Sequence, residues 1–358
     1  MISTLRDVAK KAGVSVSTAS RAMSGDRSHP VASETQERVW EAVRELNYQP
    51  NDAAQRLVRR VAKEVQRTYN IGLILGNVSY KFSDPFWSPV LSGVDDEIIR
   101  QEYHLRFAFT VDDLKRRMQR SLLSRTHIDG LILLGGVRPF GETIGRERTV
   151  VIEGGDRMRW DAQLRVDVIA AEKRRSMYML VDHLVALGRR RFAFLGPAAD
   201  HDERAEAFVH ALARHGLPLD PAFLVEAPWS VEGAYPVAQA LLRQELEMDA
   251  LVCGCDTIAI GAMRAAKEQG FRLPDDLAIT GFDDIPFARD LDPPLTTVHV
   301  PTETMGEVAV RKLIERINRP EITPIIHLVP TSLVVRASCG AQRGVGTPAA
   351  GDCKCEGA

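Results

Sequence analysis

The sequence lacks the features that mark membrane and exported proteins. No stretch of its 358 residues approaches the roughly 18 uninterrupted apolar residues of a membrane helix, and the N-terminal stretch MISTLRDVAKKAG has no apolar run like that of a signal peptide. Hydrophobic residues make up 45% of the chain and charged residues 26%, which is typical of a folded protein. We therefore expect a cytoplasmic protein of two or three domains without a membrane partner.

Cysteine is scarce, and this excludes a disulfide scaffold. The five cysteines form no C-x-x-C pair, and two C-x-C pairs in the second half of the chain are weak metal signals. Three histidines surround an expected helix but lack paired ligand spacing. We expect reduced thiols, no metal and no cofactor. The residues concerned are Cys253, Cys255, Cys339, Cys353, Cys355, His201, His210 and His215.

A large excess of one charge is also missing. The formal net charge of −2 argues against a uniformly basic nucleic-acid binder. The average hides a split, because residues 1–68 hold 12 Lys and Arg against 8 Asp and Glu, a net of +4, and the remaining 34 against 40 give −6. Such asymmetry indicates a nucleic-acid-binding end on an acidic body, although many solvated helices carry a similar surplus.

The pattern of the chain changes near Ile71. Before it, short helical patterns alternate with turns, and after it, short apolar runs rich in β-branched residues alternate with helical stretches. This alternation predicts parallel sheets covered on both faces, and the number of units exceeds one typical sheet. We expect two α/β lobes with a cleft between them. The expected strands are 71–75, 105–109, 128–134, 149–152, 192–195, 249–253 and 277–281.

Three short helices are expected in the first 50 residues. Apolar residues share one face of the first helix until Gly13 permits a turn, and Ser15 suits the N-cap of a second helix over residues 16–23. A third helix begins at Ser33, where Ser33 and Gln36 have capping-box spacing. This arrangement is typical of a helix-turn-helix, whose second helix enters the major groove of DNA.

The outward face of the second helix carries the chemistry of base reading. Arg21 can donate a bidentate pair to guanine, Ser17 and Thr18 can bond to bases or phosphates, and Val16 can touch a thymine methyl. Tyr48 and backbone N–H groups at helix starts can position phosphates. A purely structural three-helix cap with solvated Ser and Arg side chains is the alternative.

The same residues closely resemble the DNA-binding head of the lactose-repressor (LacI) family, in LRDVAKKAGVSVSTASRAMSG and ETQERVWEAVRELNYQPNDAAQRL. The resemblance continues to about residue 339. It implies a multidomain chain, in which an all-α helix-turn-helix head and a hinge helix precede an α/β bilobed core similar to periplasmic binding proteins, with two doubly wound parallel sheets. The matching body segments are DPFW (84–87), IDGLILLGG (128–136), HLVALGRRRFAFLG (183–196), 249–286, PPLTTVHVP (293–301) and LVVRASC (333–339).

The resemblance also divides the chain into domains. The charged stretch from Arg59 to Asn70 is longer than the family's usual connection, which leaves the hinge geometry in doubt. A Gly- and Ala-rich tail with little periodicity is expected to be disordered. The expected divisions are the head at 1–50, the hinge helix and linker at 51–70, the effector-binding core at 71–339 and the tail at 340–358. Within the core they are lobe 1 at about 71–165 plus 300–325 and lobe 2 at about 166–299 plus 326–339.

Roles in DNA binding follow from the match to the family. Base readers would lie on the second helix, and Tyr48 and Asn51 would contact the backbone near the hinge. Leu57 matches the leucine that these repressors insert into the minor groove at the centre of a palindromic site. Packing between the two hinge helices of a dimer is the alternative for Leu57. The expected DNA-contacting residues are Thr4, Val16, Ser17, Thr18, Ser20, Arg21, Tyr48, Asn51, Gln55 and Leu57.

Candidate effector residues combine aromatic rings with carboxylates and one arginine. Flat rings suit a sugar or a planar base, and carboxylates with arginine suit vicinal hydroxyls. Four carboxylates with one arginine would repel a phosphorylated ligand, which favours a neutral sugar or polyol. The expected effector residues are Asp84, Phe86, Trp87, Asp167, Arg204, Trp229, Asp256 and Asp283.

Several of these residues have a structural alternative. Asp84 and Asp256 also suit a turn or a helix N-terminus, and Trp229 also suits a core. The resemblance places ligand contacts at Asp167, Arg204 and Asp283. Two departures, Cys255 before Asp256 and Val168 after Asp167, each replace an Asn that is usual in the family, which puts ligand chemistry borrowed from its commonest members in doubt.

These observations predict a transcription regulator, most simply a repressor, rather than an enzyme. It would bind a palindromic double-stranded DNA operator as a homodimer, and a small-molecule effector in the cleft would alter that affinity. The tail has no heptad repeat, which favours a dimer over a tetramer. A solute-binding protein or a sugar-metabolising enzyme with a similar core is the alternative. The sequence carries none of the motifs G-x-G-x-x-G, G-x-x-x-x-G-K-[ST], G-x-S-x-G and H-E-x-x-H.

Overall fold

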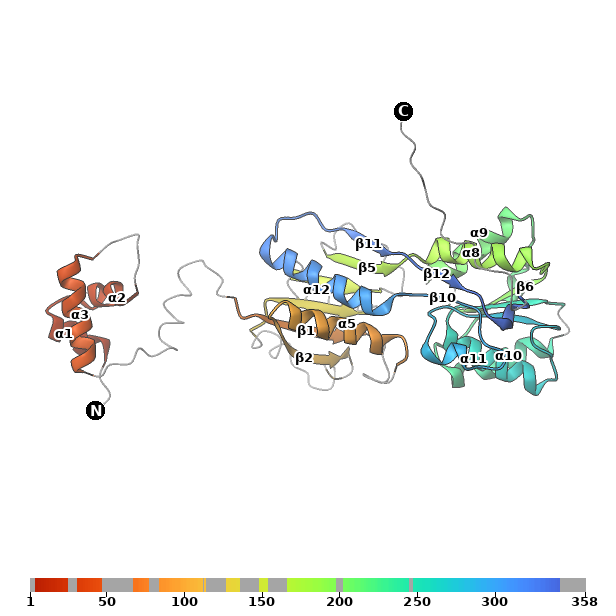
Figure 1. The fold of residues 1–358 in the computed structure, drawn as a ribbon, viewed down its shortest axis with the longest axis horizontal. Helices are drawn as coiled ribbons and strands as arrows, with labels where there is room; N and C mark the ends of the chain where they lie inside the picture. The colour runs from red at the N-terminus through yellow and green to blue at the C-terminus, as the bar shows by residue number, and fades with distance from the viewer. Residues whose placement is uncertain are drawn as a thin grey trace, which may run out of the picture. The chain divides into compact units, whose positions relative to one another are not determined.

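The computed structural model divides the chain into two units, a head unit (Met1–Arg67) and a core unit (Thr68–Ala358) (Figure 1). The predicted hinge helix and all of the predicted tail except Gly340 and Ala341 lie outside the described residues. The structure describes residues 4–24, 31–46, 67–76, 84–111, 113, 127–135, 148–153, 166–197, 202–244 and 247–341.

The head contains the three helices that the sequence predicts: α1 (Leu5–Ala12), α2 (Val16–Ser24) and α3 (Ser33–Glu45). Gly13 ends α1 with a φ of 64°, a left-handed conformation that glycine adopts without steric cost. Small apolar side chains from all three helices form the core of the head, and their size lets the helices lie close together. These side chains are Val8, Ala9, Ala12, Ala19, Ala22, Val39, Ala42 and Val43.

The predicted N-terminal cap is present in α2 but absent in α3. The Ser15 hydroxyl accepts a hydrogen bond from the backbone N of Thr18 at 3.0 Å, which confirms Ser15 as the cap of α2. Helix α3 begins at Ser33 as predicted, but its N-cap is Ala32 and no side chain caps it. The predicted capping box is therefore wrong, because Gln36 Nε2 donates to the carbonyl of Ala22 and ties α3 to α2 instead.

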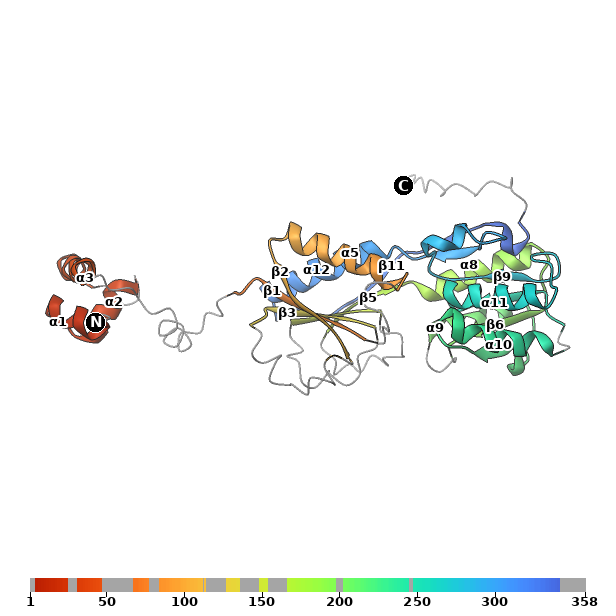
Figure 2. The same cartoon turned by 90° about the horizontal axis from the view of Figure 1, so that it is seen from below.

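Lobe 1 of the core is a six-stranded parallel sheet in the order β11-β5-β4-β3-β1-β2. Helices α5 (Trp87–Arg100) and α12 (Thr302–Asn318) cover one face of it (Figure 2). Alternate strand residues pack against these helices, and the residues between them form a second apolar cluster on the other face. The strands are β1 (Asn70–Leu75), β2 (His104–Thr110), β3 (Gly130–Leu134), β4 (Thr149–Ile152), β5 (Asp167–Ala171) and β11 (Ile326–Val329).

Two glycines let α5 and α12 pack backbone against backbone. A Cβ atom on Gly93 would lie 2.0 Å from the carbonyl oxygen of Glu303, and one on Gly306 would lie 2.3 Å from the carbonyl oxygen of Val90. Neither carbonyl can move aside without distorting its helix. Glycine is therefore required at both positions for this close approach.

Lobe 2 is a four-stranded parallel sheet in the order β7-β6-β8-β9. Helices α8 and α9 pack on one face and helices α10 and α11 on the other, each pair burying alternate residues of the strands. The strands are β6 (Phe192–Gly196), β7 (Leu224–Glu226), β8 (Ala250–Cys253) and β9 (Ala278–Thr280), and the helices are α8 (Lys173–Ala186), α9 (Glu203–Arg214), α10 (Val231–Arg243) and α11 (Asp256–Glu268).

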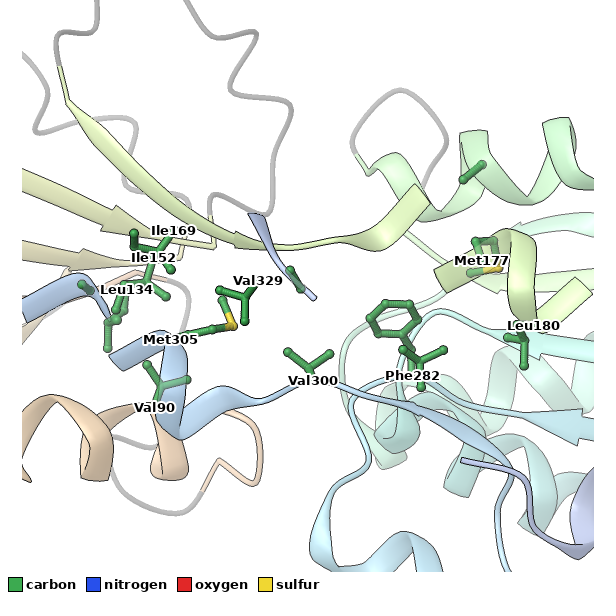
Figure 3. Packing of buried hydrophobic residues seen from close by; sticks show 14 of the residues in the cluster. Val90, Leu134, Ile152, Ile169, Met177, Leu180, Phe282, Val300, Met305 and Val329 are labelled. Atoms are coloured by element: carbon green, nitrogen blue, oxygen red, sulfur yellow. The ribbon is translucent and has the colours of Figure 1, made fainter. Parts of the chain in front are cut away.

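The chain passes between the lobes in three described segments. These follow β5, join β10 (Thr297–His299) to α12, and join β11 to β12 (Ser332–Val334). Strands β10 and β12 pair antiparallel, so two of the segments support each other. Figure 3 shows Val300 and Val329, which lie on these segments, between the buried side chains of the two lobes.

The seven strands predicted from the sequence are all present, but the lobe boundaries differ from those predicted. Strands β5 and β11 belong to the sheet of lobe 1, because β5 pairs with β4 and β11 pairs with β5. The lobes therefore divide near residues 172, 300 and 330. The core also begins earlier than residue 71, since the backbone N atoms of Thr68 and Tyr69 donate to the buried carboxylate of Asp129.

Three further observations concern features that the sequence raised. Cys253, Cys255 and Cys339 are buried free thiols, in agreement with the expected reduced state, while Cys353, Cys355 and His201 lie outside the described residues. Within the part of the chain that the structure describes, no three His, Cys, Asp or Glu side chains are grouped so that they could hold a metal ion. No described helix is long and apolar enough to cross a membrane.

Candidate DNA-reading helix and effector site

Helix α2 presents the side chains expected to read bases. Val16 is 43% exposed and Ser17 and Arg21 are exposed, whereas Ala19 and Ala22 on the opposite face are buried against α1 and α3. Thr18 and Ser20 lie at the border and are half-buried. An exposed valine among polar side chains is costly in water and suits contact with a thymine methyl.

Hydrogen bonds hold the polar side chains of this helix in place. The hydroxyl of Ser15 lies 2.8 Å from the hydroxyls of both Ser17 and Thr18, and Arg21 Nε donates to the carbonyl oxygen of Ser17 at 3.3 Å. The Thr4 hydroxyl donates to Asp7 at 2.6 Å at the start of α1. Four predicted DNA contacts lie outside the described residues: Tyr48, Asn51, Gln55 and Leu57.

In the core, Arg204 is the centre of a buried polar cluster. Its Nε and Nη2 donate to the two carboxylate oxygens of Asp202 at 2.9 Å, and its Nη1 donates to the carbonyl oxygen of Gly254 at 2.8 Å. The Trp229 and Phe282 rings have their centroids 4.6 and 5.1 Å from the guanidinium carbon. The guanidinium is therefore fixed both at its edge and by aromatic contacts.

Trp229 and Asp283 complete this cluster. Trp229 is 49% exposed, so the alternative that it is a core residue is wrong. The Asp283 carboxylate lies 4.0 Å from Arg204 Nη1, and its backbone has a φ of 119°, which is strained for a residue other than glycine. Burial raises the pKa of Asp283 well above its usual value, although Arg204 acts in the opposite direction.

A second ion pair, which no sequence pattern indicated, lies beside this cluster. The Lys173 ammonium pairs with the Glu153 carboxylate, and both residues are buried. Burial acts to lower the pKa of Lys173, but the charges of Glu153 and Asp202 outweigh it and raise the pKa. Burial acts to raise the pKa of Asp202, but Arg204 outweighs it and holds that pKa at about 2. Both cations are therefore charged and partnered.

One rule of α/β architecture explains why these residues meet. Each follows the carboxyl end of a parallel strand, where ligands of open α/β sheets bind. Glu153 directly follows β4, and Lys173 follows β5 after one residue. Asp202 and Arg204 begin α9 after β6, and Asp283 follows β9. Reading the residues just after each predicted strand, rather than family motifs alone, could have found Glu153 and Asp202.

Asp84, Phe86 and Trp87 lie at the start of α5 in lobe 1. Asp84 Oδ1 accepts hydrogen bonds from the backbone N atoms of Phe86 at 2.9 Å and Trp87 at 3.0 Å, so the turn-forming alternative is correct for Asp84. The two rings pack edge to face with centroids 4.9 Å apart. The charges of Glu153 and Asp84 also contribute to the raised pKa of Asp283, so carboxylates of both lobes are within electrostatic range.

The structure contradicts the predicted ligand contact of Asp167. Asp167 begins β5, at the end of the strand opposite to the cluster, and is fully buried. Its carboxylate pairs with Arg316 and accepts a hydrogen bond from the backbone N of Ile325 at 2.9 Å. Asp167 therefore joins β5 to α12 and to the segment before β11. The family motif was matched to the wrong end of the strand.

Asp256 also has a structural environment. It begins α11, is fully buried, and accepts hydrogen bonds from the Thr297 hydroxyl at 2.5 Å and from the backbone N of Ile285 at 2.8 Å. A Cβ atom on Gly281 would lie 2.1 Å from its Oδ1, so the carboxylate fills the space that this glycine leaves. Burial raises the pKa of Asp256 to about 7. Asp256 does not cap the helix, because the N-cap residue is Cys255. Its carboxylate instead joins α11 to β10 and to the segment after β9, and these buried contacts also leave it no ligand contact.

Comparison with known proteins identifies the family. Residues 4–51 match the model of the bacterial regulatory proteins of the lacI family, and residues 181–339 match a periplasmic binding protein-like domain. The ribose operon repressor of Haemophilus influenzae is 33% identical over 94% of this chain and 98% of its own length. The chain belongs to the LacI family. The HTH-type transcriptional repressor PurR of Erwinia tasmaniensis is 30% identical over 94% of this chain and 96% of its own length.

The solved structure of a transcriptional regulator has the same fold over nearly the whole chain. The transcriptional regulator CelR in complex with cellobiose is 25% identical, with a TM-score of 0.68 over 94% of this chain and 99% of that one. Together with the head described above, membership of the LacI family makes the protein a DNA-binding regulator of transcription. The predicted combination of a helix-turn-helix head and an α/β core is confirmed.

Proposed function

We propose that this LacI-family protein is a repressor rather than an enzyme. It binds a palindromic operator as a dimer in the cytoplasm, and a neutral sugar or polyol bound beside Arg204 and Trp229 alters its affinity for the operator. The observation that carries the ligand part is the half-exposed Trp229 ring beside a fully partnered arginine. An aromatic face supports the apolar side of a sugar ring, and fixed polar groups orient its hydroxyls.

The charges beside Arg204 favour a neutral ligand. Arg204 is neutralised by Asp202 and Lys173 by Glu153, so neither cation is left for a phosphate or carboxylate. The carboxylates of Asp84 and Asp283 add acceptors close by. This revises the sequence argument, in which four carboxylates faced one arginine, but it leads to the same class of ligand. The names of the ribose operon repressor and of the CelR complex with cellobiose agree with it.

The dimer and the palindrome follow from how such a head reads DNA. A helix the length of α2 contacts only a few base edges, so two heads on two half-sites are needed for a specific site. Two identical heads related by a twofold axis require an inverted repeat. The exposed Val16, Ser17 and Arg21 are the base-reading residues in this proposal.

Selection from random duplex DNA with the full chain tests the first part. We expect an inverted repeat to be enriched, and enrichment of unrelated sequences would contradict operator binding. A thermal-shift panel tests the ligand, using D-ribose, cellobiose, xylitol, adenine and ribose 5-phosphate. We expect a sugar or polyol to raise the Tm of the core and ribose 5-phosphate to leave it unchanged. Stabilisation by ribose 5-phosphate alone, or conversion of any panel member to a product, would replace the proposal.

A pair of variants locates the ligand. Trp229→Ala removes the exposed ring, and Phe287→Ala removes another exposed ring of lobe 2, which is 65% exposed in the segment after β9. We expect Trp229→Ala to weaken binding of the stabilising sugar about tenfold, since stacking contributes on the order of 1 kcal/mol or more. Phe287→Ala should leave it unchanged, and both should bind the selected operator normally. Equal effects of the two variants would contradict the site.

A further inference from the structure

The ion pair between Glu153 and Lys173 joins the two lobes at the first segment that connects them. Glu153 follows β4 of lobe 1, and Lys173 is the first residue of α8 in lobe 2. We propose that this pair is an interlobe brace, which holds the lobes in one relative arrangement and through which an effector beside Arg204 acts. The effector part of this inference rests on the proposed function, whereas the brace itself does not.

The Glu153 side chain holds both ends of the connection between the lobes. Its Oε1 accepts a hydrogen bond from the backbone N of Ala171 at 2.5 Å, and its Oε2 pairs with Lys173 Nζ. Ala171 is the last residue of β5, so one carboxylate fixes the residue before Glu172 and the residue after it. The contact with Ala171 lies within lobe 1 and fixes the Glu153 carboxylate there, so the contact with Lys173 is the one that a change in the angle between the lobes would strain.

The backbone conformation of Glu153 is strained, so the surrounding structure must hold this residue in place. Its φ of 46° lies in the left-handed region that residues other than glycine rarely adopt. The neighbouring Ile152 is fully buried in the core of lobe 1, which holds the chain in this conformation. Such strain persists only where surrounding packing enforces it and is common at switch regions.

Lys173 also connects the brace to the candidate effector site. The charges of Asp202 and Arg204 both act on Lys173, which couples the Glu153–Lys173 ion pair electrostatically to the Asp202–Arg204 ion pair, and the Asp283 carboxyl lies beside Arg204. The Arg204–Asp283 separation of 4.0 Å exceeds hydrogen-bond length, whereas Asp202 and Arg204 are in direct hydrogen-bond contact.

A ligand hydroxyl that bonds to Arg204 or Asp283 changes how firmly Arg204 holds Asp202. Lys173 then divides its interaction differently between Asp202 in lobe 2 and Glu153 in lobe 1. A buried ammonium loses stability when a partner carboxylate moves away. One lobe arrangement therefore has Lys173 paired mainly with Glu153, and the other has it attracted mainly to Asp202. Glu153 and Lys173 are positioning residues in this account, because they act through Asp202 and Arg204.

Distances between spin labels test the brace without ligand or DNA. Labels are placed on the full chain at exposed sites in the two lobes, with Glu315→Cys on α12 and Ala240→Cys on α10, and labelled protein is diluted with unlabelled protein. Cys353 and Cys355 are replaced by Ser. We expect a narrow distance distribution for the parent, and at least a twofold wider one for Lys173→Met and for Glu153→Gln. Glu153→Gln is nearly isosteric and keeps the acceptor for the Ala171 backbone N.

Arg174→Met is the matched control, because Arg174 neighbours Lys173 on α8 but pairs with Glu203 and Glu206 at the surface. It should leave the distribution as in the parent. Parent-like widths for both Lys173→Met and Glu153→Gln, or equal widening by Arg174→Met, would overturn the brace. Because two independent variants are compared, failure of one to fold does not decide the outcome.

Coupling to the effector is measured as the ratio of operator affinities with and without the sugar of the thermal-shift panel that stabilises the core most. Allosteric ratios of about 5–150-fold are typical, and we expect Lys173→Met to reduce the parent ratio to within about twofold while sugar binding stays detectable. An unchanged ratio would overturn the coupling through Lys173. A parent that responds to no sugar would contradict the proposed effector, and the spin-label distances would then decide the brace alone.

Discussion

The head and the core arrange their functional side chains in opposite ways. The head exposes Val16, Ser17 and Arg21 on a short helix above a small core of alanines and valines. The core unit buries Arg204 and Lys173 beside carboxylates at the ends of parallel strands. The basic head and the acidic body found in the sequence therefore also differ in where their charged groups lie, at the surface in the head and in buried ion pairs in the core.

The difference follows from the ligand that each unit is built to meet. DNA is a large polyanion that approaches from outside, so donors exposed at the surface can reach it and contribute a salt-dependent attraction. A small neutral ligand offers few contacts, so its partners must be fixed before it binds. Charge is consequently replaceable at the surface of the head and structurally essential in the core.

The largest expected effect is on the core. Arg204→Met leaves the buried Asp202 carboxylate without its partner, and we expect a loss of about 3–5 kcal/mol in the stability of the core unit. Calorimetry of the full chain measures it. Arg174→Met removes a surface pair and should cost no more than about 0.5 kcal/mol. Similar losses for the two variants would remove the contrast between buried and exposed charge.

In the head, Arg21→Ala should affect recognition and leave stability nearly unchanged. We expect binding to the selected operator to weaken by about 1–3 kcal/mol, because a bidentate contact to guanine is lost. Binding to random DNA should weaken much less, and Lys10→Ala on α1 should affect operator and random DNA alike. Titrations at fixed salt make the comparison. Equal losses on both kinds of DNA would contradict base reading by Arg21.

The pH dependence of core stability tests the buried carboxyl of Asp256. Its pKa is about 7 in the folded chain and about 3.9 in an unfolded one, so folding takes up a proton between these values. Stability should therefore fall as pH rises from about 4 to about 7, by on the order of 4 kcal/mol.

Asp256→Asn should flatten this dependence, because an amide can donate to the Thr297 hydroxyl and does not titrate. Denaturant unfolding at several pH values measures the slope. Asp290→Asn, a change at an exposed aspartate, is the control and should keep the slope of the parent. A slope that Asp256→Asn does not change would assign the pH dependence to another group.

The smallest expected effect is a helix cap in the head. Ser15→Ala removes the acceptor for the backbone N of Thr18, and we expect the head to lose about 1 kcal/mol in stability. Ser20→Ala, on the same helix but away from the cap, should change stability by less than about 0.5 kcal/mol. Circular dichroism during thermal unfolding gives both values. The core transition should not move in either variant.

Most of the fold could be predicted from local sequence patterns. Apolar runs indicated the seven predicted strands, because strands such as β1, β3, β4, β6 and β8 are buried on both faces and are apolar along their length, and the edge strand β2 keeps enough of this pattern. Strands β5, β7, β10, β11 and β12 were not predicted, and β7, β10 and β12 have only three residues each, too few to form a recognisable run. The pairing of β5 with β11 and with β4 moved the lobe boundaries, and local patterns carry no information on pairing.

The candidate site was only partly predictable. Arg204, Asp283 and Trp229 were identified from family motifs and residue type, and the structure places them together. Asp167 was included on a family motif and Asp256 on its residue type, but buried partners within the protein occupy both carboxylates. A carboxylate in a sequence looks the same whether a ligand or the protein's own Arg316 will meet it.

Local sequence patterns were enough to establish the three-helix head, the alternating α/β core, the division of charge between them and the family. These features depend on residues close together in the chain, whose periodicity and spacing are visible without a structure. Only the folded chain shows that Lys173 pairs with Glu153. The same holds for Arg204, which pairs with Asp202 and packs against the Trp229 ring. Parallel strands bring their carboxyl ends together from distant parts of the chain, and burial then requires every charge there to have a partner.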